Sequence, residues 1–180
     1  LYNAIFHDRP LAAALEAIAG NGLTGIELNT GGFLPPVHVP NVDEILDDDE
    51  ARDAFLAQFD GTGVSIAGLN CNGNPLHPDP AIGPGHAEDV RRSIRLAARL
   101  GQDRVVTMSG LPAGEPGGTR PHWIVNAWNS APPDVIEYPW SVAVPFWQET
   151  GPLPPAPCVR AAPPLPPPHH SCERRRGKEC

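Results

Sequence analysis

Apolar residues recur with two different periods along the first 150 positions, and segments with the two periods alternate. Short apolar runs, typical of buried strands, are residues 1–6, 23–29, 63–72 and 103–110. Segments in which apolar residues recur every three or four positions, typical of helices, are residues 9–22, 41–59, 86–101 and 138–149. The pattern therefore predicts four strand–helix units in succession.

Strands that alternate with helices at this spacing predict right-handed crossovers and a parallel sheet, which is an α/β fold. Four units fit either the first half of an eight-unit barrel or a small doubly wound sheet. An eight-unit barrel usually takes about 250 residues, so residues 1–150 are too few to close one. In both architectures we expect a functional site beyond the carboxyl ends of the strands.

Polar side chains concentrate at those carboxyl ends. Alternation along the third predicted strand places Asn70 and Asn72 on the same face. The alternatives are an exposed edge position for Glu27, loop packing for His77, and turn geometry for the asparagines, because Asn tolerates left-handed conformations. Asn74, inside the turn sequence NGNP, is expected to be structural. The candidate substrate-binding residues are Glu27, Asn70, Asn72, His77 and Ser109.

Several well-known motifs are absent. The sequence has no Walker loop, HExxH or GxSxG, and the glycines of GLPAGEPGG are not followed at once by a helix. Nucleotide binding on a doubly wound sheet therefore lacks its usual anchor. Cys71 is expected to pack on the outer side of its strand, with nothing nearby to lower its pKa.

The charge balance restricts the partners. A formal net charge of −8 argues against nucleic acid and against an anionic membrane surface. No apolar run approaches the roughly 18 residues of a transmembrane helix, and no basic-then-apolar leader opens the chain. We therefore expect a cytoplasmic location.

Residues 151–180 differ from the rest of the chain. Residues 1–150 have a net charge of −11, whereas 151–180 have +3 and contain 9 of the 24 prolines. This segment has no helical or strand period and is predicted to be a disordered tail. Its PPLPPP run could be a polyproline ligand, and its histidines and cysteines could bind a metal, although their spacing fits no zinc template. A shifted reading frame in a GC-rich gene is the explanation we favour.

Taken together, several stretches of residues 1–150 carry a family resemblance. The most specific are GIELN and LNCNGNPLHPDP, supported by DVRRSIRLAARLG and RVVTMSGLPAGEPG. They resemble the sugar phosphate isomerase/epimerase family, which has the xylose isomerase-like TIM barrel shared with AP endonuclease 2-type proteins. The resemblance implies that residues 1–150 are a parallel (βα)4 half of a TIM barrel.

The resemblance also implies a chemistry. Such enzymes move a proton next to a carbonyl through an enediolate, and a divalent metal, Mn, Mg, Co or Zn, holds the oxygens of a small sugar or sugar phosphate. Family members carry a Glu–Asp–His–Glu metal set on the last four strands, and no residue of this chain matches it. We therefore expect the chain to lack isomerase activity in this form, with its catalytic residues unknown.

Half a barrel has open sheet edges, and these edges predict self-association. The alternative functions are an AP endonuclease-like DNA repair enzyme, against which the net charge of −11 argues, and a non-catalytic truncated or interaction protein.

Overall fold

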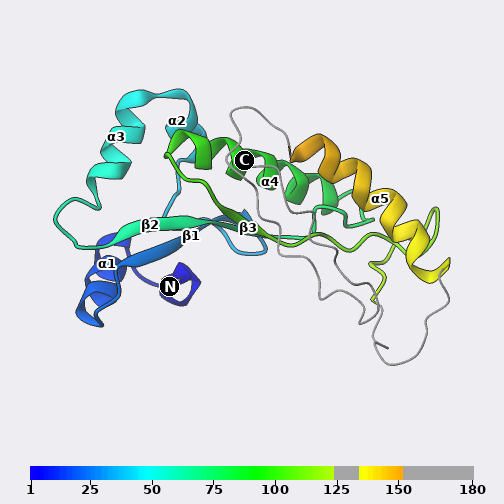
Figure 1. Ribbon diagram of the computed structural model, residues 1–180, viewed down its shortest axis with the longest axis horizontal. Helices are drawn as coiled ribbons and strands as arrows, with labels where there is room; N and C mark the ends of the chain where they lie inside the picture. Colours follow the sequence, from blue (N-terminus) through cyan, green and yellow to red (C-terminus); the bar gives the residue numbers. More distant parts are fainter. Residues whose placement is uncertain (124–133, 152–180) are drawn as a thin grey trace, which may run out of the picture.

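The computed structural model describes residues 1–123 and 134–151, and it contains a three-stranded parallel sheet in the order β1-β2-β3 (Figure 1). The strands are β1 (Gly25–Gly32), β2 (Ser65–Asn72) and β3 (Val105–Thr107). All neighbouring pairs are parallel, so the predicted parallel α/β architecture is confirmed.

Helices cover one face of this sheet. The helix α1 (Leu11–Gly20) packs on β1, and α4 (Gly83–Arg99) contacts all three strands. Val90 and Ile94 of α4 are buried against fully buried strand residues, because apolar residues three and four positions apart share one helix face. The helix α5 (Asp134–Thr150) lies next to α4 and continues across two internal prolines (Figure 1).

A bulge in β2 determines which side chains face the helices. Ile66 pairs with Ile26, but the next residue of β1, Glu27, pairs with Gly68, so Ala67 is an extra residue. Beyond the bulge, Asn70 pairs with Asn29 and shares the face of Glu27. The sheet therefore has an apolar face toward the helices and a polar face on the other side.

The strand predicted over residues 1–6 is wrong beyond its second residue. Tyr2 forms a single parallel bridge with Glu27, and a 3-10 helix begins immediately, η1 (Asn3–Phe6). The amide of Glu27 donates to the carbonyl of Leu1, but the amide of Asn29 donates to Oδ1 of Asn3. The Asn3 side chain thus replaces a backbone carbonyl in the ladder, which frees the chain to turn away.

Residues 41–59, predicted to be helical with a turn in the acidic run Asp47–Glu50 and a helix beginning near Ala51, form two helices, α2 (Val42–Asp47) and α3 (Asp49–Ala57). Asp48 between them is extended, and its carboxylate accepts the backbone N–H of Glu50 at 2.9 Å. Asp is a strong N-cap residue and a poor residue for a helix interior. The acidic run therefore ends one helix and begins another.

The predicted tail and its proposed motifs lie, apart from Gly151, outside the described residues. Within residues 1–123 and 134–151, no helix combines the length and the apolar character that crossing a bilayer requires.

Candidate functional site

The loops that follow β1 and β2 meet at the carboxyl ends of these strands. The amide of Phe33 donates to the carbonyl of Asn72 at 2.7 Å. Gly32, with a φ of 94°, lies so close to this carbonyl that a Cβ atom there would overlap it. Only glycine fits this conformation and this contact. The Thr-Gly-Gly sequence therefore brings the two loops together.

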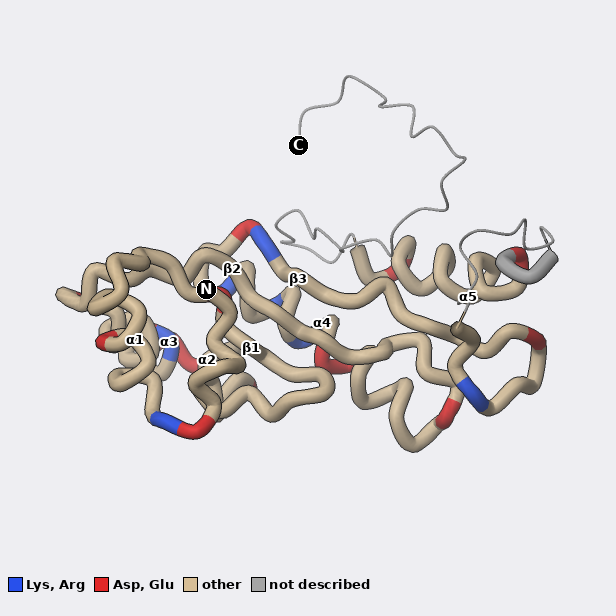
Figure 2. The backbone as a smooth tube through the Cα atoms, turned by 90° about the horizontal axis from the view of Figure 1, so that it is seen from below, with Lys and Arg blue, Asp and Glu red and all other residues tan. Residues whose placement is uncertain are grey.

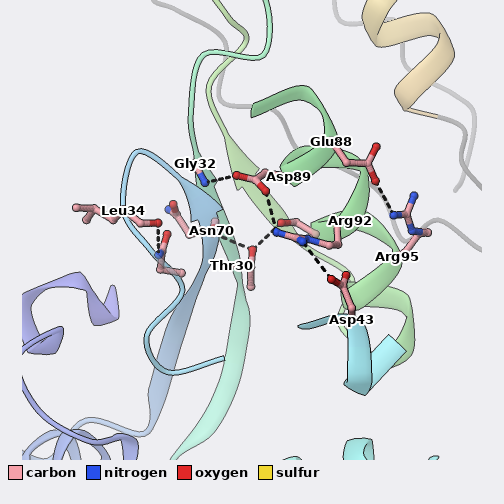
Figure 3. A network of polar contacts seen from close by, with 11 residues as sticks. Thr30, Gly32, Leu34, Asp43, Asn70, Glu88, Asp89, Arg92 and Arg95 are labelled. Carbon is pink, nitrogen blue, oxygen red and sulfur yellow. Dashed lines mark hydrogen bonds and ion pairs between the residues drawn. The ribbon is translucent and has the colours of Figure 1, made fainter. Parts of the chain in front are cut away.

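A polar network on the helix-facing side holds this junction (Figure 3). Asp89 of α4 accepts the amide of Gly32 at 3.0 Å with one oxygen and pairs with Arg92 at 2.9 Å through the other. Thr30 donates to the carbonyl of Asn70 and shares a 2.7 Å hydrogen bond with Ser93. These contacts link α4 to the ends of both strands, so the helix fixes the positions of the loops.

Cys71 faces this network from β2. Burial raises the pKa of its thiol to about 11, and a hydrogen bond with Ser93 offsets only part of that effect. Cys71 is fully buried, as the sequence predicted for the outer side of its strand. A thiol in this state is an inert packing group.

The opposite face of the sheet holds the strongest candidate pair. Nδ2 of Asn70 donates to Oε1 of Glu27 on the neighbouring strand. Asn70 is only 3% exposed, yet its Oδ1 has no hydrogen-bond partner among the described residues. A buried acceptor without a donor is uncommon in folded proteins and costs roughly 1–3 kcal/mol. This amide therefore has the capacity to accept one more hydrogen bond.

Tyr2 borders the same pair. Its hydroxyl donates to Oδ1 of Asn29 at 3.2 Å. Burial raises the pKa of Tyr2, the negative charge of Glu27 adds to this, and the amide of Asn72 opposes it. Tyr2, Glu27, Asn70 and Asn72 thus form one cluster, which we call the strand-end cluster. Sequence analysis missed Tyr2, because the strand that carries it was predicted only as an apolar run.

His77 and Ser109 lie elsewhere. Nδ1 of His77 accepts the amide of Asp79 at 3.0 Å, and the ring borders a groove of about 520 Å³ whose walls also include Arg91 and Phe146. The carbonyl of Ser109 accepts the indole N–H of Trp147 at 2.8 Å. In the part of the chain that the structure describes, no hydrogen bond joins either residue to Glu27 or Asn70.

Asn74 has the structural role that the turn sequence predicts. Its Oδ1 accepts the amides of Leu76 and Leu111, and its Nδ2 donates to the carbonyl of Leu111. These bonds tie the loop after β2 to the loop after β3.

The strand-end cluster does not fit a divalent metal ion. Divalent metal sites in proteins draw on several carboxylate, imidazole or thiolate groups. Glu27 is the carboxylate of the cluster, and its neighbours are a phenol and amides. Across residues 1–123 and 134–151, no three His, Cys, Asp or Glu side chains are grouped so that they could hold a metal.

Comparison with known families identifies the class of protein. Residues 15–134 match the family model described as the xylose isomerase-like TIM barrel. The chain therefore belongs to the xylose isomerase-like TIM barrel family, as the resemblance of GIELN and LNCNGNPLHPDP indicated.

Two similar proteins are longer than this chain. The "Uncharacterized protein YfiH" of Bacillus subtilis (strain 168) is 36% identical over 143 residues, which are 78% of this chain and 45% of that protein. A xylose isomerase-like TIM barrel protein from Mycobacterium smegmatis, solved in complex with magnesium, is 20% identical with a TM-score of 0.47. That alignment covers 81% of this chain and 44% of the other. The chain thus spans less than half the length of each.

Proposed function

We propose that this chain forms the substrate-binding side of an isomerase or epimerase that acts on a small sugar or sugar phosphate. The observation that carries the proposal is the buried Oδ1 of Asn70, which has no donor among the described residues although its amide is fixed by Glu27. Membership in the xylose isomerase-like family supports a polyol as the ligand. A hydroxyl group of such a ligand would supply the missing donor.

The residues of the strand-end cluster would bind and orient the substrate. Oε1 of Glu27 is occupied by Asn70, so Oε2 is the carboxylate oxygen left for a substrate hydroxyl. Asn72 lies on the same face and can donate or accept. His77 and Ser109 belong to the proposal as outer contacts along the loops after β2 and β3. Isomerisation or epimerisation then requires that a proton leave the carbon next to the carbonyl and return, through an enediolate.

The divalent metal that the family implies, Mn, Mg, Co or Zn, has no fitting set of ligands among the described residues. We therefore propose that the isolated chain binds a sugar without converting it. A cytoplasmic location and the division into residues 1–150 and a tail of 151–180 remain predictions.

A binding experiment tests the proposal. Calorimetric titration with D-fructose and with D-fructose 6-phosphate should detect binding, and Asn70→Leu should weaken it by about tenfold or more. Ser65→Ala is the matched control, because Ser65 is an exposed residue at the start of the same strand. A wild-type chain that binds neither sugar, or an Asn70→Leu chain that binds like the wild type, would contradict the proposal.

Exchange with solvent tests the absence of turnover. With each of the four metals in D2O, the isolated chain should incorporate no deuterium next to the ketose carbonyl, as read by NMR. Incorporation would show that this chain carries the catalytic groups itself.

We also propose that the chain associates with a second copy through its open sheet edges. In the described residues β3 pairs with β2 alone, and an unpaired edge is a template for another strand. Gel filtration with light scattering should detect species larger than 19.2 kDa. A monodisperse monomer with a sharp thermal transition would contradict this.

A further inference from the structure

A chain of hydrogen bonds runs from the start of α1 to the strand-end cluster. Nε2 of His38 lies 2.9 Å from the carbonyl of Arg9, and Nδ1 of His38 lies 2.7 Å from Nδ2 of Asn3. Oδ1 of Asn3 accepts the amide of Asn29 at 2.7 Å. This series of hydrogen bonds thus connects Arg9, two residues before α1, with the loop after β1, η1 and β1 itself.

The backbone groups at its two ends fix the direction of every bond. The amide of Asn29 can only donate, so the side-chain oxygen of Asn3 must face it and the NH2 group must face His38. The carbonyl of Arg9 can only accept, so Nε2 of His38 carries the proton and Nδ1 accepts from Asn3. The orientation of Asn3 and the tautomer of His38 are therefore both determined.

The three side chains in this series of hydrogen bonds are deeply buried. Asn3 is 1% exposed, and His38 and Asn29 are 3% exposed. Nδ2 of Asn29 also donates to the carbonyls of Leu34 and Pro35, which leaves its Oδ1 for the hydroxyl of Tyr2. A buried polar network whose members are all paired holds its geometry tightly. Its last bond positions the phenol of Tyr2.

Tyr2 is the half-buried end of this network and lies beside Glu27. Its hydroxyl hydrogen is used by Asn29, and the Asn72 amide lies beside its oxygen, which keeps a second lone pair to accept with. Oε2 of Glu27 and Oδ1 of Asn70 accept no hydrogen bond from the described residues. Three acceptor oxygens, one of them charged, suit hydroxyl donors and disfavour a phosphate or carboxylate.

We propose that Tyr2 is a further ligand-contacting residue that accepts a hydroxyl hydrogen from the uncharged end of a polyol, and that His38 is its positioning residue, acting through Asn3 and Asn29. This inference rests on the proposed function. Any phosphate of the substrate would lie away from Tyr2 and Glu27.

Titration of the Tyr2 phenol tests the positioning role without a ligand. The chain has two tyrosines, so a Tyr138→Phe background leaves Tyr2 alone in the ultraviolet difference spectrum. In His38→Asn, the new Oδ1 replaces Nδ1 and still accepts from Asn3. His38→Gln retains a donor for the carbonyl of Arg9 and loses the acceptor for Asn3. We expect the pKa of Tyr2 to stay raised in His38→Asn and to fall toward its ordinary value in His38→Gln.

Circular dichroism melts check that both His38 variants fold. Equal titration of Tyr2 in the two variants would overturn the positioning role. If one variant fails to fold, the pKa of Tyr2 in the other is compared with its value in the Tyr138→Phe background chain. A lowered pKa in His38→Asn, or an unchanged pKa in His38→Gln, then overturns the positioning role.

Ligand binding tests the contact itself. Tyr2→Phe should weaken D-fructose binding by about three- to tenfold, because one hydrogen bond is lost. If Asn70→Leu weakens binding and Tyr2→Phe does not, the contact is wrong and the proposed function stands. If the wild-type chain binds neither D-fructose nor D-fructose 6-phosphate, the proposed function fails and the ligand contact fails with it, whereas the titration still decides the positioning role.

Discussion

The strand-end cluster and the outer surface where α2, α3 and α4 meet show two different uses of polar residues. The outer surface has a hollow of about 660 Å³ bordered by Arg52, Arg95 and Arg99. These arginines pair with carboxylates at 2.6–2.8 Å, and basic and acidic positions lie side by side at α3 (Figure 2). The strand-end cluster has one carboxylate and a buried acceptor that no donor in residues 1–123 and 134–151 reaches.

The difference shows that neither hollow size nor charge identifies the better candidate site. The two charged groups of an exposed ion pair satisfy each other, and such a pair contributes about 0–1 kcal/mol to the free energy of unfolding. A buried amide with unused hydrogen-bonding capacity is a local cost that a ligand can relieve. The following predictions test whether the strand ends are as tightly specified as this contrast implies.

The largest effect is expected for Gly32→Ala. The new Cβ would overlap the carbonyl of Asn72 at a φ of 94°, so we expect a loss of about 3 kcal/mol or more of unfolding free energy, or no folded chain. Gly22→Ala is the control, since Gly22 has a φ of 73° and no atom within 4 Å of the new Cβ. That change should cost about 1–2 kcal/mol. Equal losses in urea unfolding would contradict the close contact of the two loops.

Alkaline pH should destabilise the fold through Cys71. The pKa of Cys71 is about 11 in the folded chain against an ordinary 9.0. Its contribution to the free energy of unfolding is therefore complete below pH 9 and is lost as the pH rises to 11. The expected loss is about 3 kcal/mol. Urea unfolding across this range should show the decline, and Cys71→Ala should remove the part that begins near pH 9. Tyr2, whose pKa is also raised from its ordinary 10.0, contributes a further decline above pH 10 in both chains. The three cysteines of residues 151–180 are present in both chains and cancel in the comparison. An unchanged slope in Cys71→Ala would count against a buried, protonated thiol.

Asp89 and Glu88, which are neighbours on α4, should differ in how much they contribute to the stability of the fold. Asp89→Ala removes the acceptor of the Gly32 amide and the partner of Arg92, which should cost about 1–3 kcal/mol. Glu88→Ala removes an exposed ion pair with Arg95 and should cost about 0–1 kcal/mol. Thermal melts of both variants make the comparison directly. Similar shifts in melting temperature would mean that Asp89 does not anchor the loop after β1.

The smallest effect is expected at the outer surface. Arg52→Ala breaks pairs with Asp49 and Asp53, both highly exposed, and should cost less than about 1 kcal/mol. Because exposed charges are screened, the loss should shrink further at high salt. A large loss that persists in concentrated salt would show that this surface is more than a set of solvated ion pairs.

Local patterns were enough to predict most of the sheet and its main helices. The spacing of apolar residues is clear in β1, β2, α1 and α4, because each of these elements has a continuous apolar face. The prediction failed at Asn3, where a side chain takes the place of a backbone group. Such substitutions leave no trace in hydrophobic periodicity.

The candidate site was only partly predictable for a related reason. Alternation indicated that Asn70 and Asn72 share a face, and the structure places Glu27 beside Asn70. His38 and Asn3 lie 35 positions apart in the sequence, and no local pattern links them. Tyr2 and Asn29 are separated by 27 positions and were missed for the same reason. Long-range pairs of this kind depend on strand register, which a single sequence does not specify.

The extra residue Ala67 determines how β2 responds to a change in its length. Upstream of it, the even-numbered Ile66 turns toward the helices, and downstream the even-numbered Asn70 turns away from them. Deletion of Ala67 would remove the bulge and leave a regular strand, in which Gly68 still pairs with Glu27 and Asn70 keeps its face. Insertion of one further residue between Gly68 and Leu69 would instead turn Asn70 and Asn72 toward the helices and Leu69 and Cys71 away from them. Natural variants of this strand should therefore tolerate the loss of one residue at the bulge but not the gain of one after it.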